Sequence, residues 1–282
     1  MKEADIELNF FLDKMIQAGA SDLHMAHNQH IYFRIDGELR RHELKIQGPD
    51  VFQLVLPILK ADSKQNTFHE ERTVDFGYTY KGVRFRGNMA YEKGQPSLVI
   101  RKIDAKIMTF KEMGLPEFIK DILLEPWGIV LVTGPTGSGK TTTLTSMLDY
   151  INQQKKVHIA TVEDPIEYVH TNKKAHITQR EIGPDALSFE EATETVLRRD
   201  PDVILIGEMR SRETIKAAVT NAETGHLVLG TLHTNNAPQT IQRMVDFYEP
   251  SIQSTARKQI ASTLKLIINQ RLVKNKNGKG RH

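Results

Sequence analysis

The spacing of apolar residues changes along the chain and divides it into two kinds of pattern. In the first hundred residues, apolar positions at helical spacing predict helices from residue 6 to near residue 19 and over 51–58. Alternating runs on either side of residues 36–37 and 81–82 predict two β-hairpins, and a further strand is expected at 97–103. The pattern therefore indicates a small α+β domain over residues 1–103.

A second pattern begins at residue 127, where short apolar runs alternate with amphipathic stretches. Four runs predict buried strands: 128–133, 157–162, 203–206 and 226–232. A last helix is expected over 252–268. Strands that alternate with helices favour a parallel sheet covered on both faces, so residues 127–282 are predicted to form an α/β domain.

The stretch between these two domains carries breakers of regular structure. Gly114, Pro116 and Pro126 surround one short helical segment. Residues 104–126 are therefore predicted to be the linker.

A glycine-rich loop joins the first predicted strand of the second domain to its first helix. Residues 134–141 (GPTGSGKT) match the phosphate-binding pattern G-x-x-x-x-G-K-[ST] without a mismatch. The backbone amides of such a loop wrap phosphate, the lysine reaches the β- and γ-phosphates, and the threonine hydroxyl can ligate Mg²⁺. The predicted ATP-binding set is Gly134, Pro135, Thr136, Gly137, Ser138, Gly139, Lys140, Thr141 and Thr142.

Other predicted strands of this domain end in polar residues that suit nucleotide chemistry. Because the carboxyl ends of parallel strands meet at one edge of a sheet, Glu163, Glu208 and His233 are expected beside the loop. Glu208 follows four apolar residues and a glycine, and we expect it to polarise the attacking water. Glu163 is expected to hold Mg²⁺, partly through water, together with Thr141, or to act in catalysis by positioning the attacking water. His233 is a candidate γ-phosphate sensor, although a lone histidine at a strand end is as often a surface residue.

An arginine that meets the charge of the transition state is expected as well. Arg84 and Arg86 share one face of a predicted strand, and Arg101 lies on the next strand. These three residues are candidates for that role, and a solvated strand face is the alternative interpretation.

Composition narrows the classes of function. The formal net charge of the 282 residues is +3, which is too weak to indicate nucleic-acid binding. There are no cysteines, so disulfides and cysteine zinc sites are excluded. No apolar run approaches the ~20 residues that span a bilayer, and the start of the chain lacks the apolar core of a signal peptide. A cytoplasmic protein that reaches the membrane only through partners is expected.

Several stretches resemble the secretion ATPase superfamily, and within it the PilT-like retraction ATPases of type IV pili. They are 20–24 (ASDLH), 34–37 (RIDG), 163–167 (EDPIE), 177–183 (ITQREIG), 199–210 (RDPDVILIGEMR), 222–234 (AETGHLVLGTLHT) and 240–246 (TIQRMVD). The resemblance implies a homohexamer in which a PAS-like domain is joined to a RecA-like motor, and it matches the three arginines to phosphate-directed arginines. Ser211 departs from the aspartate usual in the family, and the chain stops inside a recognisable segment, so residues from about 273 onward are expected to be poorly ordered.

The leading hypothesis is a hexameric motor that hydrolyses ATP to retract type IV pili. It implies an inner-membrane platform protein of a pilus machine as partner, and a location at the inner face of the cell membrane. The main alternative is an assembly ATPase of a pilus, a type II secretion system or a competence system. A nucleotide-binding regulator with little turnover is disfavoured by the intact site residues, and a nucleic-acid translocase by the weak charge.

Overall fold

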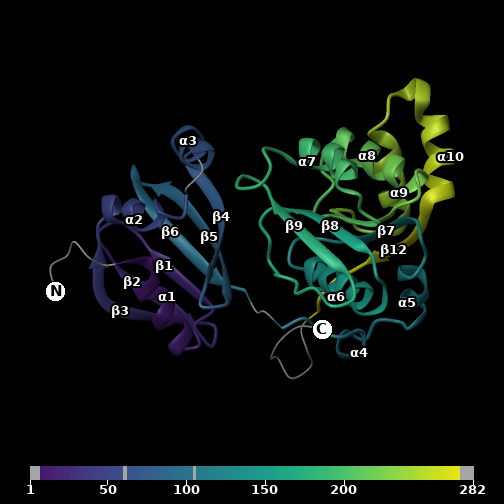
Figure 1. The fold of residues 1–282 in the computed structure, drawn as a ribbon. Coiled ribbons are helices and arrows are strands. Elements are labelled where there is room, and N and C mark those ends of the chain that lie inside the picture. The colour runs from purple at the N-terminus through teal and green to yellow at the C-terminus, as the bar shows by residue number, and fades with distance from the viewer. Residues whose placement is uncertain (1–6, 60–61, 104–105, 274–282) are drawn as a thin grey trace. The chain divides into compact units, whose positions relative to one another are not determined.

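The chain folds into two compact units (Figure 1). The computed structural model describes residues 7–59, 62–103 and 106–273. The first unit comprises Met1–Lys106 together with Pro165–Val169, and the second comprises Ile107–Asp164 and His170–His282. Most of the tail that was expected to be poorly ordered, residues 274–282, lies outside the described residues.

The first unit is built on a six-stranded antiparallel sheet in the order β3-β2-β1-β6-β5-β4. Its strands are β1 Asp22–Met25, β2 Gln29–Ile35, β3 Glu38–Ile46, β4 Thr73–Tyr80, β5 Val83–Glu92 and β6 Gln95–Lys102. Its helices are α1 Leu8–Gln17, α2 Gly48–Val55 and α3 Asp62–Glu71.

Both predicted hairpins of this unit are confirmed. Asp36 and Gly37 have φ values of 52° and 86°, and Lys81 and Gly82 have values of 49° and 76°. Positive φ at both central residues gives the turn the twist that matches the flanking strands. The apolar face of α1 is buried in the core of this unit, together with alternate residues of β1, β5 and β6.

The second unit is built on a six-stranded parallel sheet in the order β12-β7-β11-β10-β8-β9. Its strands are β7 Gly128–Thr133, β8 His158–Glu163, β9 His176–Glu181, β10 Val203–Ile206, β11 Leu227–Leu232 and β12 Leu264–Asn269. Its α-helices are α4 Phe110–Met113, α5 Phe118–Leu123, α6 Lys140–Gln154, α7 Phe189–Thr195, α8 Arg212–Glu223, α9 Ala237–Asp246 and α10 Gln253–Thr263, and its 3₁₀ helices are Val196–Arg199 and Pro250–Ile252.

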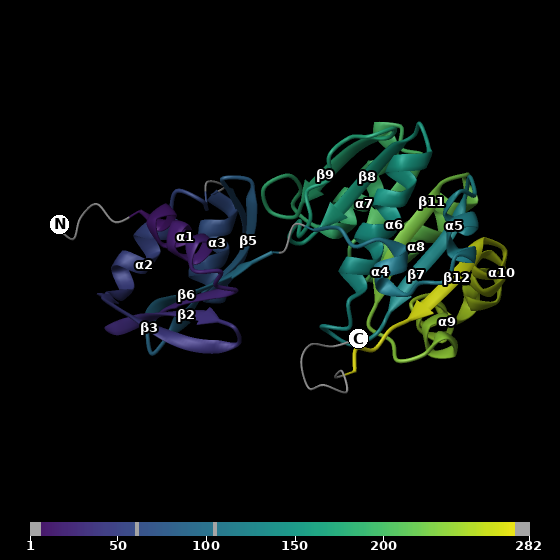
Figure 2. The same ribbon diagram turned by 90° about the horizontal axis from the view of Figure 1, so that it is seen from below.

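Helices cover both faces of the parallel sheet, as the alternation of strands and helices predicted. Ile129 and Leu131 of β7 pack with α8, α9 and α10, whereas Val130 and Val132 pack with α4, α5 and α6. Figure 1 shows the first set of helices on one side of the sheet, and Figure 2 shows α6 on the other. The central strands β7, β10 and β11 are buried along their whole length because both faces are covered, which explains their continuous apolar runs.

Two expectations about this unit were wrong. Most of the predicted linker 104–126 belongs to the second unit, because Phe110, Ile119 and Leu123 are buried beside α6. The helix expected over 252–268 ends at Thr263, and the chain continues as the edge strand β12. The pattern missed this change because β12 is half-buried, so its apolar residues continue the run of the preceding helix.

Candidate functional site

The loops that could carry chemistry lie at one edge of the parallel sheet. Strands β7, β8, β10 and β11 run in the same direction, and each is followed by one of the predicted site segments. Ligands of parallel α/β sheets bind beyond the carboxyl ends of the strands. The tertiary structure thus brings the glycine loop and the loops after β8, β10 and β11 to the same edge.

The glycine loop has the backbone that only glycine adopts without strain. Gly134, Gly137 and Gly139 have φ values of 144°, 75° and 88°. A Cβ atom at Gly134 would lie 2.3 Å from the carbonyl oxygen of Gln270, which follows β12. The glycine loop therefore packs closely against the end of β12, the edge strand that the sequence pattern did not predict.

The start of α6 fits a phosphate. Gly139 is its N-cap and provides no side-chain oxygen, so no cap side chain accepts from the amides of the first turn, where Thr141 and Thr142 lie. Among the described residues, Ser138 Oγ is buried without a hydrogen-bond partner. These donors match a phosphate-rich ligand.

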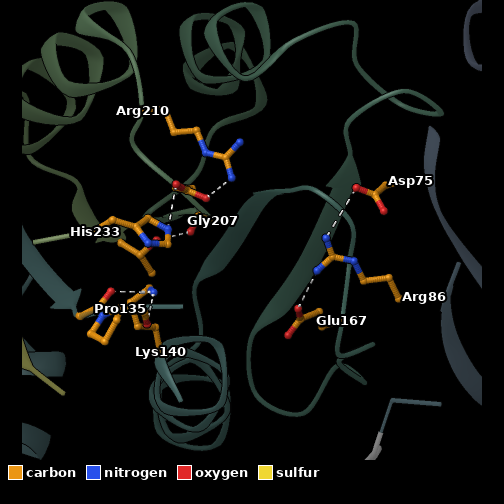
Figure 3. A network of polar contacts seen from close by, with 11 residues as sticks. Asp75, Arg86, Pro135, Lys140, Glu167, Gly207, Arg210 and His233 are labelled. Carbon is orange, nitrogen blue, oxygen red and sulfur yellow. Dashed lines mark hydrogen bonds and ion pairs between the residues drawn. The ribbon is translucent and has the colours of Figure 1, made fainter. Parts of the chain in front are cut away.

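Lys140 is nearly buried and turns back on its own loop. Its Nζ donates hydrogen bonds to the carbonyl oxygens of Gly134 and Pro135, at 3.0 and 3.1 Å (Figure 3). Burial lowers the pKa of this ammonium group, and the negative charge of Glu208 opposes that shift. The two carbonyl bonds are ones that a phosphate can replace when it enters the loop.

The backbone that carries Glu208 is held from both sides. Thr231 Oγ1 donates to the carbonyl oxygen of Gly207 at 2.7 Å, and the Met209 amide donates to the Thr231 carbonyl oxygen at 3.0 Å. Met209 is buried, with its methyl group against Gly230, where a Cβ would lie only 2.3 Å away. The position of the Glu208 backbone is therefore set by β11 and the core.

The Glu208 carboxylate has one partner on each oxygen. Oε1 lies 2.9 Å from His233 Nε2, and Oε2 accepts from Arg210 Nη2 at 2.6 Å (Figure 3). Burial by itself would raise the pKa of Glu208, but the hydrogen bond and charge of Arg210 and the charges of His233 and Lys140 outweigh it and lower the pKa. Glu208 is thus kept ionised, as a group that polarises water must be.

Glu163 ends β8 as a buried carboxylate. Its Oε1 accepts from Thr161 Oγ1 at 2.6 Å and from Gln179 Nε2, on the neighbouring β9, at 3.1 Å. Within the part of the chain that the structure describes, no cluster of three or more His, Asp or Glu residues is suited to hold a metal ion. The carboxylate of Glu163 and the hydroxyl of Thr141 nevertheless fit Mg²⁺, because this ion is commonly held by one or two protein oxygens together with phosphates and water.

The three candidate arginines share one face of the first unit's sheet. Phe85 and Ile100 point into the core, so Arg84, Arg86 and Arg101 lie on the opposite face. Arg86 and Arg101 are directly opposite each other in the β5–β6 ladder. This is the shared face that alternation predicted.

Each of these arginines has partners inside the first unit. Arg84 Nε donates to the Ile166 carbonyl oxygen at 2.8 Å. Arg86 lies 3.7 Å from carboxylates of both Asp75 and Glu167 (Figure 3). Arg101 Nε donates to the buried Asp22 at 2.7 Å.

The structure brings some of the predicted site residues together within one unit. Lys140, Glu208 and His233 form one charged cluster in the second unit, whereas the three arginines belong to the first. Among the residues that contact predicted ones, Arg210, Gln179 and Asp22 were given no role from the sequence. All three stand in the stretches that carry the family resemblance, which was the one available sign of them.

Comparisons with known proteins give a consistent result. The family model described as type II/IV secretion system protein matches residues 3–281. The type IV pilus retraction ATPase PilT of Pseudomonas aeruginosa is 46% identical over 265 residues, which cover 93% of this chain and 76% of that protein. No helix of residues 7–59, 62–103 or 106–273 is both long enough and apolar enough to cross a membrane.

Two solved structures are similar over the whole chain. A crystal structure of the pilus retraction motor PilT with bound ADP has a TM-score of 0.89 at 42% identity, covering 99% of this chain and 81% of its own. The Legionella pneumophila ATPase DotB has a TM-score of 0.91 at 26% identity, covering 100% and 80%. The chain therefore belongs to the type II/IV secretion system protein family and, within it, to the PilT-type ATPases.

Proposed function

We propose that this protein hydrolyses ATP to drive the retraction of type IV pili. The observation that carries the proposal is the convergence of Lys140, Glu208 and His233 beside a phosphate-binding loop. Phosphoryl transfer to water needs neutralised phosphate charge and an oriented nucleophile. Lys140 supplies the charge, and the ionised Glu208 orients the water.

The remaining site residues complete this assignment. Mg²⁺ supplies charge neutralisation between the phosphates when it is bound. Thr141, in the first turn of α6, and the buried Glu163 would hold it, the latter partly through water. His233, which shares Glu208 as a partner, would sense the γ-phosphate. Residues 134–142 would cradle the rest of the triphosphate.

The three candidate arginines extend the proposal to an oligomer. Arg84, Arg86 and Arg101 would meet the phosphates of an adjacent subunit, in a homohexamer with a PAS-like first unit and a RecA-like second unit. The platform protein of a pilus machine would recruit this ring to the cytoplasmic face of the inner membrane. Assembly of a pilus or of a secretion system is the alternative outcome.

Hydrolysis is tested with the purified protein. Lys140→Ala should abolish turnover and weaken ATP binding, since it removes the charge that faces the β- and γ-phosphates. Lys155→Ala is the matched control, because Lys155 is the C-cap at the far end of α6 and its ammonium group donates to the carbonyl oxygens of Leu124 and Glu125. Turnover of Lys140→Ala at the wild-type rate would refute the assignment of the site.

Retraction is tested in cells by deleting the gene. Loss of a retraction motor should leave cells with surface pili that no longer twitch, and the wild-type gene should restore twitching where Lys140→Ala does not. Cells without any pili would instead identify an assembly motor. Normal twitching would remove the pilus assignment altogether.

A further inference from the structure

Two arginines flank the N-cap residue at the start of α8, but they face different partners. Ser211 is the N-cap and forms a capping box with Thr214, so it fills the place of the aspartate usual in the family. The positive end of a helix dipole disfavours cations there, so each arginine needs an anion to offset that cost. Arg212 bonds the exposed Glu249 at 3.0 Å, whereas Arg210 bonds Glu208.

The backbone of Arg210 is fixed by its two neighbours in the chain, so its side chain is the part that can change conformation. Its backbone lies between Met209, which is buried in the core, and Ser211, which is fixed in the cap. The Glu208 backbone is fixed by Thr231 on β11. The direction in which the Glu208 carboxylate points is therefore decided by its side-chain partners, His233 and Arg210.

Arg210 also lies close to a second acidic residue of the site. The hydrogen bond to Glu208 raises the pKa of the Arg210 guanidinium, and the negative charge of Asp164 adds to that rise. Asp164 directly follows Glu163, the candidate Mg²⁺ residue. The positive charge of Arg210 is thus favoured by Asp164 as well as by its hydrogen-bond partner Glu208.

We propose that Arg210 is a positioning residue that holds the Glu208 carboxylate in the direction needed to orient the attacking water. The proposal rests on the proposed ATPase function. Glu208 has a 19% exposed side chain and takes one partner on each oxygen. With Arg210 removed, it keeps one anchor and can rotate about its side-chain bonds.

This role differs from that of an ordinary surface ion pair. Exposed pairs contribute little because both side chains remain in water and are screened by salt. The Arg210 side chain is 74% exposed, but its partner is largely buried, so the bond restrains the partner more than it stabilises the fold. Arg210 is therefore expected to affect the rate of hydrolysis more than stability or nucleotide affinity.

The test compares Arg210→Ala, Arg210→Lys and Arg212→Ala with the wild type. Arg210→Ala should lower kcat about 10- to 100-fold, the loss expected for one charge-assisted hydrogen bond, with KM and the affinity for a fluorescent ATP analogue unchanged within about twofold. Arg210→Lys keeps the charge and should restore part of the rate. Arg212→Ala removes an arginine two residues away whose partner is Glu249, and it should keep the wild-type kcat.

A double-mutant cycle shows whether Arg210 acts through Glu208. In single-turnover assays, adding Arg210→Ala to Glu208→Gln should change the rate less than about twofold, because the group being positioned is already lost. The same four proteins, melted without nucleotide and followed by the fluorescence of Trp127 in the second unit, should show non-additive stabilities. These melts also show whether Arg210→Ala is folded at the assay temperature.

Three results would overturn the proposal: wild-type kcat in Arg210→Ala, equal losses in the two backgrounds, or a loss confined to KM. A wild-type protein that does not hydrolyse ATP would instead refute the proposed function, and the inference with it. The two failures are thus distinguishable by the wild-type control alone.

Discussion

Replacing Asp22 with asparagine should destabilise the first unit in a pH-dependent way. Asp22 lies in the middle of the sheet, with Arg34 of β2 and Arg101 of β6 directly opposite it in the two ladders. Its side chain is 5% exposed and accepts from Arg101 Nε at 2.7 Å and Ser21 Oγ at 2.8 Å, with Arg34 Nε at 3.7 Å. Asp22→Asn keeps the shape and removes the charge.

The size of the effect follows from these contacts. A hydrogen bond to a charged group contributes about 1.5–3 kcal/mol to stability. The Arg101 side chain is 68% exposed, which favours the lower end of that range, about 1.5–2 kcal/mol. For a unit of this size the midpoint of unfolding should fall by roughly 6–15 °C at neutral pH.

The pH dependence has a definite sign. Burial would raise the pKa of Asp22, but the hydrogen bonds from Arg101 and Ser21 and the charge of Arg101 bring it below its usual value. A carboxyl that is more acidic in the folded state contributes stability above its unfolded pKa and loses it as the pH falls through the folded value. The gap between the wild type and Asp22→Asn should therefore close below about pH 4.

Scanning calorimetry of the whole chain measures this gap. The single tryptophan, Trp127, belongs to the second unit, so its fluorescence follows that unit separately. Asp36→Asn is the matched control, because it removes a charge at an exposed turn where asparagine accepts the positive φ of 52°. A midpoint equal to that of the wild type, or a gap that widens on acidification, would refute the reasoning.

Two further predictions concern the nucleotide site. Glu208→Gln should retain nucleotide affinity and lower kcat about 100- to 1,000-fold, since the side chain keeps its shape but no longer polarises water. Nucleotide affinity and single-turnover rates should be measured together, and an unchanged turnover rate would contradict the prediction. Gly134→Ala should weaken ATP binding at least about tenfold, because its Cβ would lie 2.3 Å from the Gln270 carbonyl oxygen at a φ of 144°. Gly225→Ala is the control, because it places a side chain at a similarly strained φ of 104° but meets no neighbouring atom. ATP affinity at the wild-type level in both glycine variants would contradict the prediction, since the predicted clash at Gly134 would then have no effect on binding.

Much of the fold was predictable because its elements are encoded locally. The glycines at 37 and 82 mark hairpin turns in any antiparallel sheet, and the four buried strands of the second unit stand out as apolar runs between helices. Strand β1 has four residues, and β9 carries polar residues on an edge, so neither gives a clear apolar pattern. Prolines and glycines suggested a linker at 104–126, where three apolar side chains in fact anchor the stretch to the core.

The candidate site shows the same division. The glycine loop, Glu163, Glu208 and His233 could be identified from their places after apolar strands. Their partners could not, because a contact such as that of Gln179 with Glu163 depends on which strand lies beside β8. The family stretch 199–210 includes Arg210 and leaves out Arg212, but it does not say that Arg210 bonds Glu208 whereas Arg212 bonds Glu249.

By itself, then, the sequence determined the elements, the phosphate-binding loop and the family, because periodicity and motif spacing are properties of neighbouring residues. Only the tertiary structure decided which side chains meet: the two partners of Glu208, the carboxylate between Arg34 and Arg101, and the edge strand whose end closes against Gly134. These side-chain contacts depend on the order and the register of the strands. Both are set by the burial of two sheet faces at once, which no stretch of sequence encodes alone.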